Sequence, residues 1–112
     1  MSVTLAYLSL AVAILLGVAG QILFKSGANS APNLAAQLLN PLTLVGLVVY
    51  GIAAVAYIRA LSKIPVSIAF PSAASSYAVV AILAHFLWNE PLGWQQWAGI
   101  ALIASGVTLI LL

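Results

Sequence analysis

The chain has 112 residues, of which 65% are hydrophobic and 4% are charged, and its formal net charge is +2. These values lie far outside the range of soluble domains and indicate a membrane protein. So small a net charge gives no reason to expect a nucleic-acid partner, and a chain without cysteine has no disulfide framework and no thiolate chemistry.

The few charged residues separate long apolar segments, and a spanning helix needs about 20 predominantly apolar residues. The segments predict four transmembrane helices, at roughly residues 3–24, 41–61, 65–88 and 94–112. We therefore expect an all-α polytopic membrane protein with a single four-helix domain over residues 1–112. A signal peptide is the alternative for the first segment, but no basic residue precedes its apolar run.

The first predicted helix carries a polar amide and ends at a basic residue. Gln21 would lie about one turn inside the membrane, where its amide needs partners, either on another helix or in a cavity. Lys25 follows, and Ser26-Gly27 is a typical stop signal. In the segment after it, apolar residues on one face predict a short interfacial helix before Asn40.

The second predicted helix starts at Asn40-Pro41, an N-cap residue followed by proline. Arg59 and Lys63 lie four residues apart at its C-terminal end, where cations suit the helix dipole. Long basic side chains at helix ends commonly reach for headgroups, and this reading also applies to Lys25. The functional alternative is that the three cations bind a phosphate group at the membrane surfaces.

The third predicted helix contains Pro71, which removes a backbone hydrogen bond and should bend the helix. Just after it, Ser75, Ser76 and Tyr77 could line a groove, although close helix packing explains the serines equally well. His85 is the only side chain that titrates near neutrality. Its place near the end of the helix favours an interfacial structural role over proton coupling.

The loop before the fourth helix holds Glu90, the only acidic residue of the chain. We expect its charge to be hydrated or paired with a basic neighbour. In the fourth helix, Gly99 and Gly106 lie two turns apart on one face, where small residues let backbones approach closely. This stripe favours self-association, and packing within one subunit is the alternative.

Four spans place both termini and the loop after the second helix on one side of the membrane. That side holds Arg59, Lys63 and the terminal amine, and the other side holds Lys25. The positive-inside rule therefore favours cytoplasmic termini, by a margin narrow enough to permit dual insertion.

One histidine, one acidic residue and no cysteine cannot supply a metal site or a nucleophile with its base of the usual kinds. We therefore expect neither an enzyme nor a bound metal or cofactor.

Four motifs resemble those of the small multidrug resistance (SMR) type of the drug/metabolite transporter superfamily. They are G-Q-I-L-F-K at residues 20–25, I-P-V-S-I-A-F-P at 64–71, N-E-P-L at 89–92 and W-A-G-I-A-L-I-A-S-G-V at 97–107. The resemblance covers nearly the whole chain and implies a four-helix fold that works as a dimer. It also implies that Gly99 and Gly106 lie in the dimer interface.

The chain differs from SMR drug exporters at three informative positions. Those exporters carry a glutamate where this chain has Gly17, and a tyrosine and a tryptophan where it has Phe70 and Ala73. The resemblance therefore implies that their site for protons and cations is absent here. The run P-V-S-I-A-F-P at 65–71 and the W-x-E-P motif at 88–91 are more similar to another branch. Paired subunits of that branch flip 4-amino-4-deoxy-L-arabinose-phosphoundecaprenol.

This second resemblance implies a flippase for a polyprenyl-phosphate-linked sugar, or a similar anionic lipid, in the bacterial inner membrane. The protein would act as a homodimer or as a heterodimer with a paralogue, and Glu90 would belong to a loop signature. The expected substrate-binding residues are Lys25, Gln21, Arg59, Lys63, Ser75, Ser76 and Tyr77. Two alternatives remain, an SMR-type exporter of small metabolites or drugs and a non-transporting subunit of a membrane complex.

Overall fold

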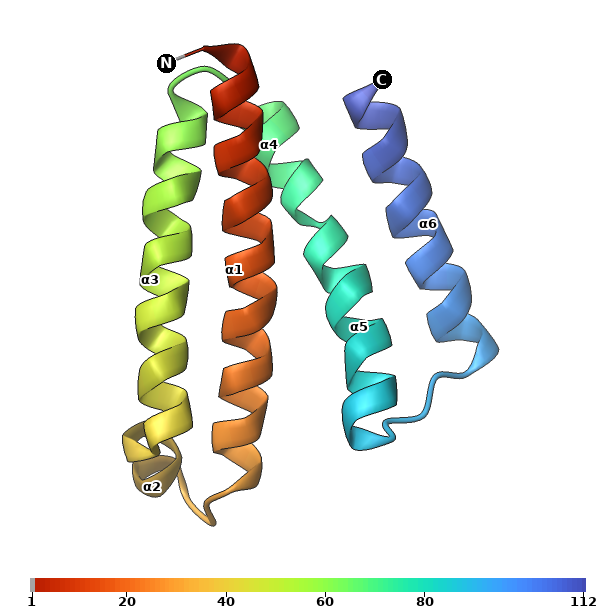
Figure 1. Cartoon of the computed structure of the whole chain (residues 1–112). Helices are drawn as coiled ribbons and strands as arrows, with labels where there is room; N and C mark the ends of the chain where they lie inside the picture. The colour runs from red at the N-terminus through yellow and green to blue at the C-terminus, as the bar shows by residue number, and fades with distance from the viewer. Residues whose placement is uncertain (1) are drawn as a thin grey trace.

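The computed structural model describes residues 2–112, and this part of the chain is helical, without strands (Figure 1). The helices are α1 (Val3–Asn29), α2 (Leu34–Leu39), α3 (Pro41–Leu61), α4 (Val66–Ala73), α5 (Ser75–Trp88) and α6 (Trp94–Leu111). Four segments are long and apolar enough to cross a membrane: α1, α3, the segment Val66–Trp88 and α6. The prediction of an all-α chain with four spans is confirmed.

Helix α1 is longer than the sequence predicts. It continues past Lys25 and through Ser26-Gly27 to Asn29, so the expected stop signal does not end it. A Cβ on Gly27 would overlap the side chain of Thr43 and lie 3.0 Å from its backbone nitrogen. The glycine therefore serves close packing of α1 against α3, which supports the additional turn, rather than termination.

Helices α1 and α3 form an antiparallel pair along most of their length (Figure 1). Glycines on both helices let the backbones approach: Gly20 faces the ring of Tyr50, and Gly46 faces the side chains of Leu23 and Phe24. Lipid tails are as apolar as these side chains, so helices associate in a membrane through such close packing. The α2 helix and the α4–α5 span pack against this pair.

Short polar caps shape the connection between α1 and α3. The side chain of Asn33 accepts a hydrogen bond from the backbone N–H of Ala36 at 2.9 Å and starts α2. The side chain of Asn40 accepts one from Leu42 at 2.9 Å and starts α3, in the N-cap position expected for it. As a result α2 lies beneath the α1–α3 pair, at the end where α1 stops (Figure 1).

The third span is divided into α4 and α5 by an interruption at Ala74, three residues after Pro71. The N–H of Ala74 donates to the Pro71 carbonyl, and the N–H of Tyr77 donates to the Ala74 carbonyl, each at 3.0 Å. These are tight turns of the 3₁₀ type. The Ser76 hydroxyl donates to the Ala73 carbonyl at 2.7 Å, so the break leaves this carbonyl satisfied inside the membrane.

The buried core lies toward the end that carries the termini, where small residues join α1, α3 and α4. Its fully buried members are Ala6, Leu10, Ala60, Ile64 and Ala69. Helix α6 lies outside this core, because within residues 2–112 it packs only against α4 and α5 and none of its residues is buried. Both termini lie at the same end of the molecule (Figure 1).

Candidate functional site

A pocket of about 230 Å³ lies between α1, α3, α4 and α5. Its walls are mostly small or apolar side chains, with two tyrosines and one serine. The lining residues are Ala13, Ile14, Gly17, Tyr50, Ala53, Ala54, Tyr57, Phe70, Ala73 and Ser76. No side chain in this described lining carries a charge, so the pocket is neutral.

The three positions at which the chain differs from SMR exporters meet in this pocket. Gly17 on α1 and both Phe70 and Ala73 on α4 line it. A Cβ built on Gly17 would have no described atom within 4 Å outside its own helix. A longer side chain at this position would therefore enter open space. The lining of the pocket contains no carboxylate.

The polar groups of the pocket are hydroxyls. The hydroxyl of Tyr57 is buried and has no hydrogen-bond partner among residues 2–112. A buried hydroxyl without a partner costs about 1–3 kcal/mol, and in this pocket it is available to a group of a ligand or to water. Tyr50 lies two turns before Tyr57 on α3, and its ring packs against the ring of Phe24 with 5.6 Å between the ring centroids.

Neither tyrosine of α3 was predicted from the sequence to belong to the site. A signal for them exists: Tyr50 and Tyr57 lie two turns apart and enclose the small pair Ala53 and Ala54 on the same helical face. In a helix that is otherwise bulky and apolar, a face of this composition indicates a cavity into which the tyrosines present their hydroxyl groups.

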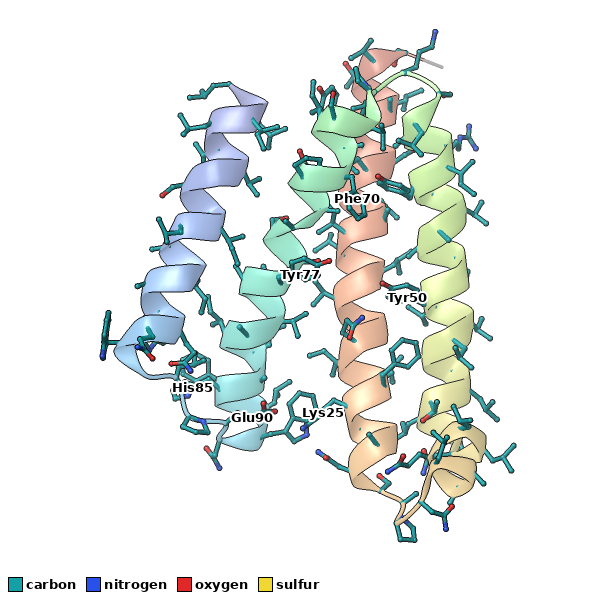
Figure 2. All side chains as sticks on the ribbon, turned by 180° about the vertical axis from the view of Figure 1, so that it is seen from behind. Lys25, Tyr50, Phe70, Tyr77, His85 and Glu90 are labelled. Carbon is teal, nitrogen blue, oxygen red and sulfur yellow. The ribbon has the colours of Figure 1, made fainter. Side chains whose placement is uncertain are left out.

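Only one of the three residues predicted to line a groove after Pro71 does so. Ser76 lines the pocket, whereas Ser75 and Tyr77 do not, and Tyr77 is 67% exposed. Gln21 is exposed on α1 and is also not part of the lining. In Figure 2, Tyr50 and Phe70 lie in the middle part of the molecule, well away from Lys25.

Lys25 and Glu90 meet at one end of the molecule. The Lys25 ammonium lies 3.5 Å from a Glu90 carboxylate oxygen, and each side chain is 44% exposed. Figure 2 shows the two residues between the end of α1 and the loop before α6. The only acidic side chain of the chain is therefore paired with a basic one, and the pair connects α1 to the α5–α6 loop.

His85 organises the same loop. Its Nδ1 atom lies 2.8 Å from the carbonyl oxygen of Glu90, and because a carbonyl only accepts, Nδ1 carries the hydrogen. Asn89 between them adopts the left-handed conformation that commonly ends a helix, with φ 53°. The ring also packs edge-on against Trp97, at a centroid distance of 6.2 Å. These contacts fix His85 against the α5–α6 loop and the start of α6.

The other two basic residues lie at the opposite end, so the three cations do not meet. Lys63 is exposed in the turn between α3 and α4, where its N–H donates to the Ala60 carbonyl at 3.1 Å. Arg59 is also exposed, but it lines a second groove on the outer face of the α1–α3 pair and not the central pocket. Residues 2–112 hold no cluster of three or more potential metal ligands.

Four membrane-crossing segments, three of which enclose a neutral pocket, are the features of a small multi-pass membrane transporter. Residues 1–112 match the model described as the EamA-like transporter family, and the chain belongs to this family. Its expected relationship to the drug/metabolite transporter superfamily is thereby confirmed.

Several relatives of similar size are found among curated proteins. The chain is 36% identical over 95 residues to the uncharacterized protein y4nH of Sinorhizobium fredii, covering 81% of each chain. It is also similar to proteins described as probable 4-amino-4-deoxy-L-arabinose-phosphoundecaprenol flippase subunit ArnE. The Escherichia coli protein is 31% identical over 105 residues, which cover 93% of this chain and 95% of the relative. The Escherichia fergusonii protein is 35% identical over 66 residues, which cover 59% of this chain and 60% of the relative. No solved structure matches the chain significantly.

Proposed function

We propose that this transporter is a flippase subunit that moves a polyprenyl-phosphate-linked sugar, or a similar anionic lipid, across the bacterial inner membrane. The observation that carries the proposal is the neutral, hydroxyl-bearing pocket, in which Gly17 stands where drug exporters of the SMR type have a glutamate. The similarity to the probable flippase subunits of Escherichia supports it.

The pocket suits a sugar better than a lipophilic cation. Hydroxyls of Tyr57 and Ser76 can donate to and accept from sugar hydroxyls, whereas a cation needs a carboxylate that the lining does not offer. The volume of about 230 Å³ is also below the ~300 Å³ from which drug-sized ligand sites begin. The polyprenyl tail can stay in lipid throughout, so only the sugar and phosphate need shelter.

Lys25 is the proposed phosphate site at one end of the path. An ammonium group binds phosphate well as a point charge. The ammonium of Lys25 is already paired with the Glu90 carboxylate, and both side chains are partly exposed to solvent. An arriving phosphate would compete with the Glu90 carboxylate for the same cation. Substrate binding would thereby detach the α5–α6 loop from α1.

At the other end, Lys63 is the better candidate for the phosphate. It lies in the turn between α3 and α4, two of the helices that line the pocket, whereas Arg59 lines the groove on the outer face of the α1–α3 pair. The positive-inside rule favours a cytoplasmic location for this end, together with both termini.

The proposed working unit is a dimer, either with a second copy or with a paralogue. A Cβ on Gly99 or Gly106 would have no described atom within 4 Å outside its own helix, so the glycine stripe of α6 is not used by packing within the subunit. A stripe of this kind lets a second helix approach closely. Helix α6 is therefore the proposed interface.

Reconstitution tests the proposal. Vesicles containing the protein, with its paralogue where one is required, should accelerate transbilayer movement of a radiolabelled undecaprenyl-phosphate aminosugar compared with empty vesicles. No acceleration by folded protein would reject the flippase. Proton flux driven by quaternary ammonium compounds would instead identify an exporter. If the activity of the membrane complex to which the protein belongs is unchanged in a Lys25→Ala variant, a non-transporting subunit would be favoured.

A further inference from the structure

A second groove of about 360 Å³ lies on the α1–α3 pair, outside the proposed transport path. Its apolar walls include Leu8 and Val12 from α1 and Ile52 and Val55 from α3. Two polar side chains, Ser9 and Arg59, complete it.

This groove and the central pocket lie on opposite faces of α3. The pocket is lined by Tyr50 and Tyr57, and the groove by Ile52 and Arg59, each two residues further along. Two residues correspond to about 200° around a helix. A molecule bound in the groove therefore does not occupy the sugar pocket.

The charge of Arg59 has no acidic side chain to balance it. The chain has one acidic residue, Glu90, and among the described residues Glu90 pairs with Lys25 at the other end of the molecule. A guanidinium at the membrane surface that lacks a protein partner is a ready site for a phosphate. The Ser9 hydroxyl, on the facing helix, can add a hydrogen bond.

The groove extends from this cation into the hydrocarbon layer. Arg59 lies in the last turn of α3, and Ile52, seven residues earlier, lies about 10 Å deeper along the helix axis. Gly20 faces Tyr50 and Gly27 faces Thr43 across the antiparallel pair, so Arg59 lies near the level of Ser9 and Val12 on α1, and Leu5 lies nearer the end that carries the termini. A ligand that fits this shape has an anionic head at Arg59 and an apolar chain that runs along α3 toward Ile52.

We propose that the groove is a binding site for an anionic phospholipid of the surrounding bilayer, with its phosphate on Arg59 and one acyl chain between α1 and α3. Anionic lipids are the bilayer component with the matching charge. The site is independent of the proposed transport activity, and a dimer formed through α6 leaves it accessible.

Native mass spectrometry of the intact protein in detergent tests the site. The probes are phosphatidylglycerol and phosphatidylcholine, added singly at the same concentration. The wild type should retain phosphatidylglycerol, and Arg59→Gln should weaken its retention about tenfold, the effect of one lost charge-assisted hydrogen-bonded contact. Arg59→Lys is the matched control, because it keeps a positive charge at the same place in the groove, and it should retain the lipid.

Two further measurements separate the lipid from other occupants. Val55→Trp should fill the groove and lower lipid retention although Arg59 is intact, while inorganic phosphate should fail to compete. Equal retention of the two lipids by the wild type would overturn the proposal, as would equal weakening by Arg59→Gln and Arg59→Lys. A Val55→Trp protein that changes its oligomeric state and keeps its lipid would show that a second copy covers the groove.

Discussion

The ammonium of Lys25 on α1 and the carboxylate of Glu90 in the α5–α6 loop form an ion pair of 3.5 Å. The pair lies at the end of the molecule opposite the two termini. The pair unites the only acidic side chain of the protein with one of its three basic residues. Because both side chains are 44% exposed, the pair contributes little to stability, within about 1 kcal/mol. Its importance lies in what competes for Lys25.

Substitution of the two partners should have opposite effects on transport. Lys25→Ala removes the proposed phosphate contact and should lower the flipping rate at limiting substrate about tenfold. Glu90→Gln removes the competitor and should tighten apparent substrate affinity by up to about fivefold, the value of an exposed ion pair. Initial rates of lipid flipping in vesicles measure both. Equal losses in both variants would mean that the pair acts as a structural unit.

Gly17 offers a test of the pocket's neutrality. Gly17→Glu should fold, because a Cβ there meets open space, but it places a carboxylate where an anionic lipid head must pass. We expect a loss of flipping of about tenfold or more from like-charge repulsion in a site of low dielectric. Gly17→Gln is the control of equal size and should lose much less. Similar losses in the two variants would show that the space, not its neutrality, matters.

Tyr57→Phe should separate stability from function. The hydroxyl is buried without a partner in the described chain, so its removal should leave stability unchanged or raise it by about 1 kcal/mol. If a sugar hydroxyl normally satisfies it, the same variant should raise the KM for flipping severalfold. Thermal unfolding in detergent and flipping kinetics measure the two effects. A destabilised variant with normal KM would assign the hydroxyl to the fold.

Two glycines provide a matched pair for helix packing. Gly27→Ala should destabilise the protein by about 1–3 kcal/mol, the range for overpacking, because its Cβ would overlap the Thr43 side chain. Gly51→Ala should be neutral or slightly stabilising, since a Cβ there meets no described atom within 4 Å. Unfolding of both variants in mixed micelles measures the difference. Equal stability would show that α1 and α3 separate easily.

The number and order of the spans could be predicted because apolar length and sparse charges are read directly from the chain. Gly17, Phe70 and Ala73, which the resemblance singled out as a group, line one pocket. Resemblance to a family located them, since composition alone gives no reason to connect α1 with α4.

The directions in which side chains face could not be predicted in the same way. In a helix that is apolar all round, hydrophobic periodicity does not distinguish inner from outer faces. Arg59 was therefore grouped with Lys63, although it lies in the groove away from the pocket. The position at which α1 ends was predicted wrongly for a related reason. Gly27 packs against Thr43, which is distant in the sequence, and this contact cannot be read from its neighbours in the chain.

The interruption at Ala74 divides the third span into parts that belong to different ends of the molecule. Helix α4 contributes Ala69 to the buried core near the termini, whereas α5 leads to the loop held by Lys25 at the far end. The Ser76 hydroxyl on α5 donates to the Ala73 carbonyl on α4, in place of a regular helical hydrogen bond across the break. We therefore expect the third span to bend at this point, so that a change in the relative tilt of α4 and α5 would alter the shape of the pocket that both helices line.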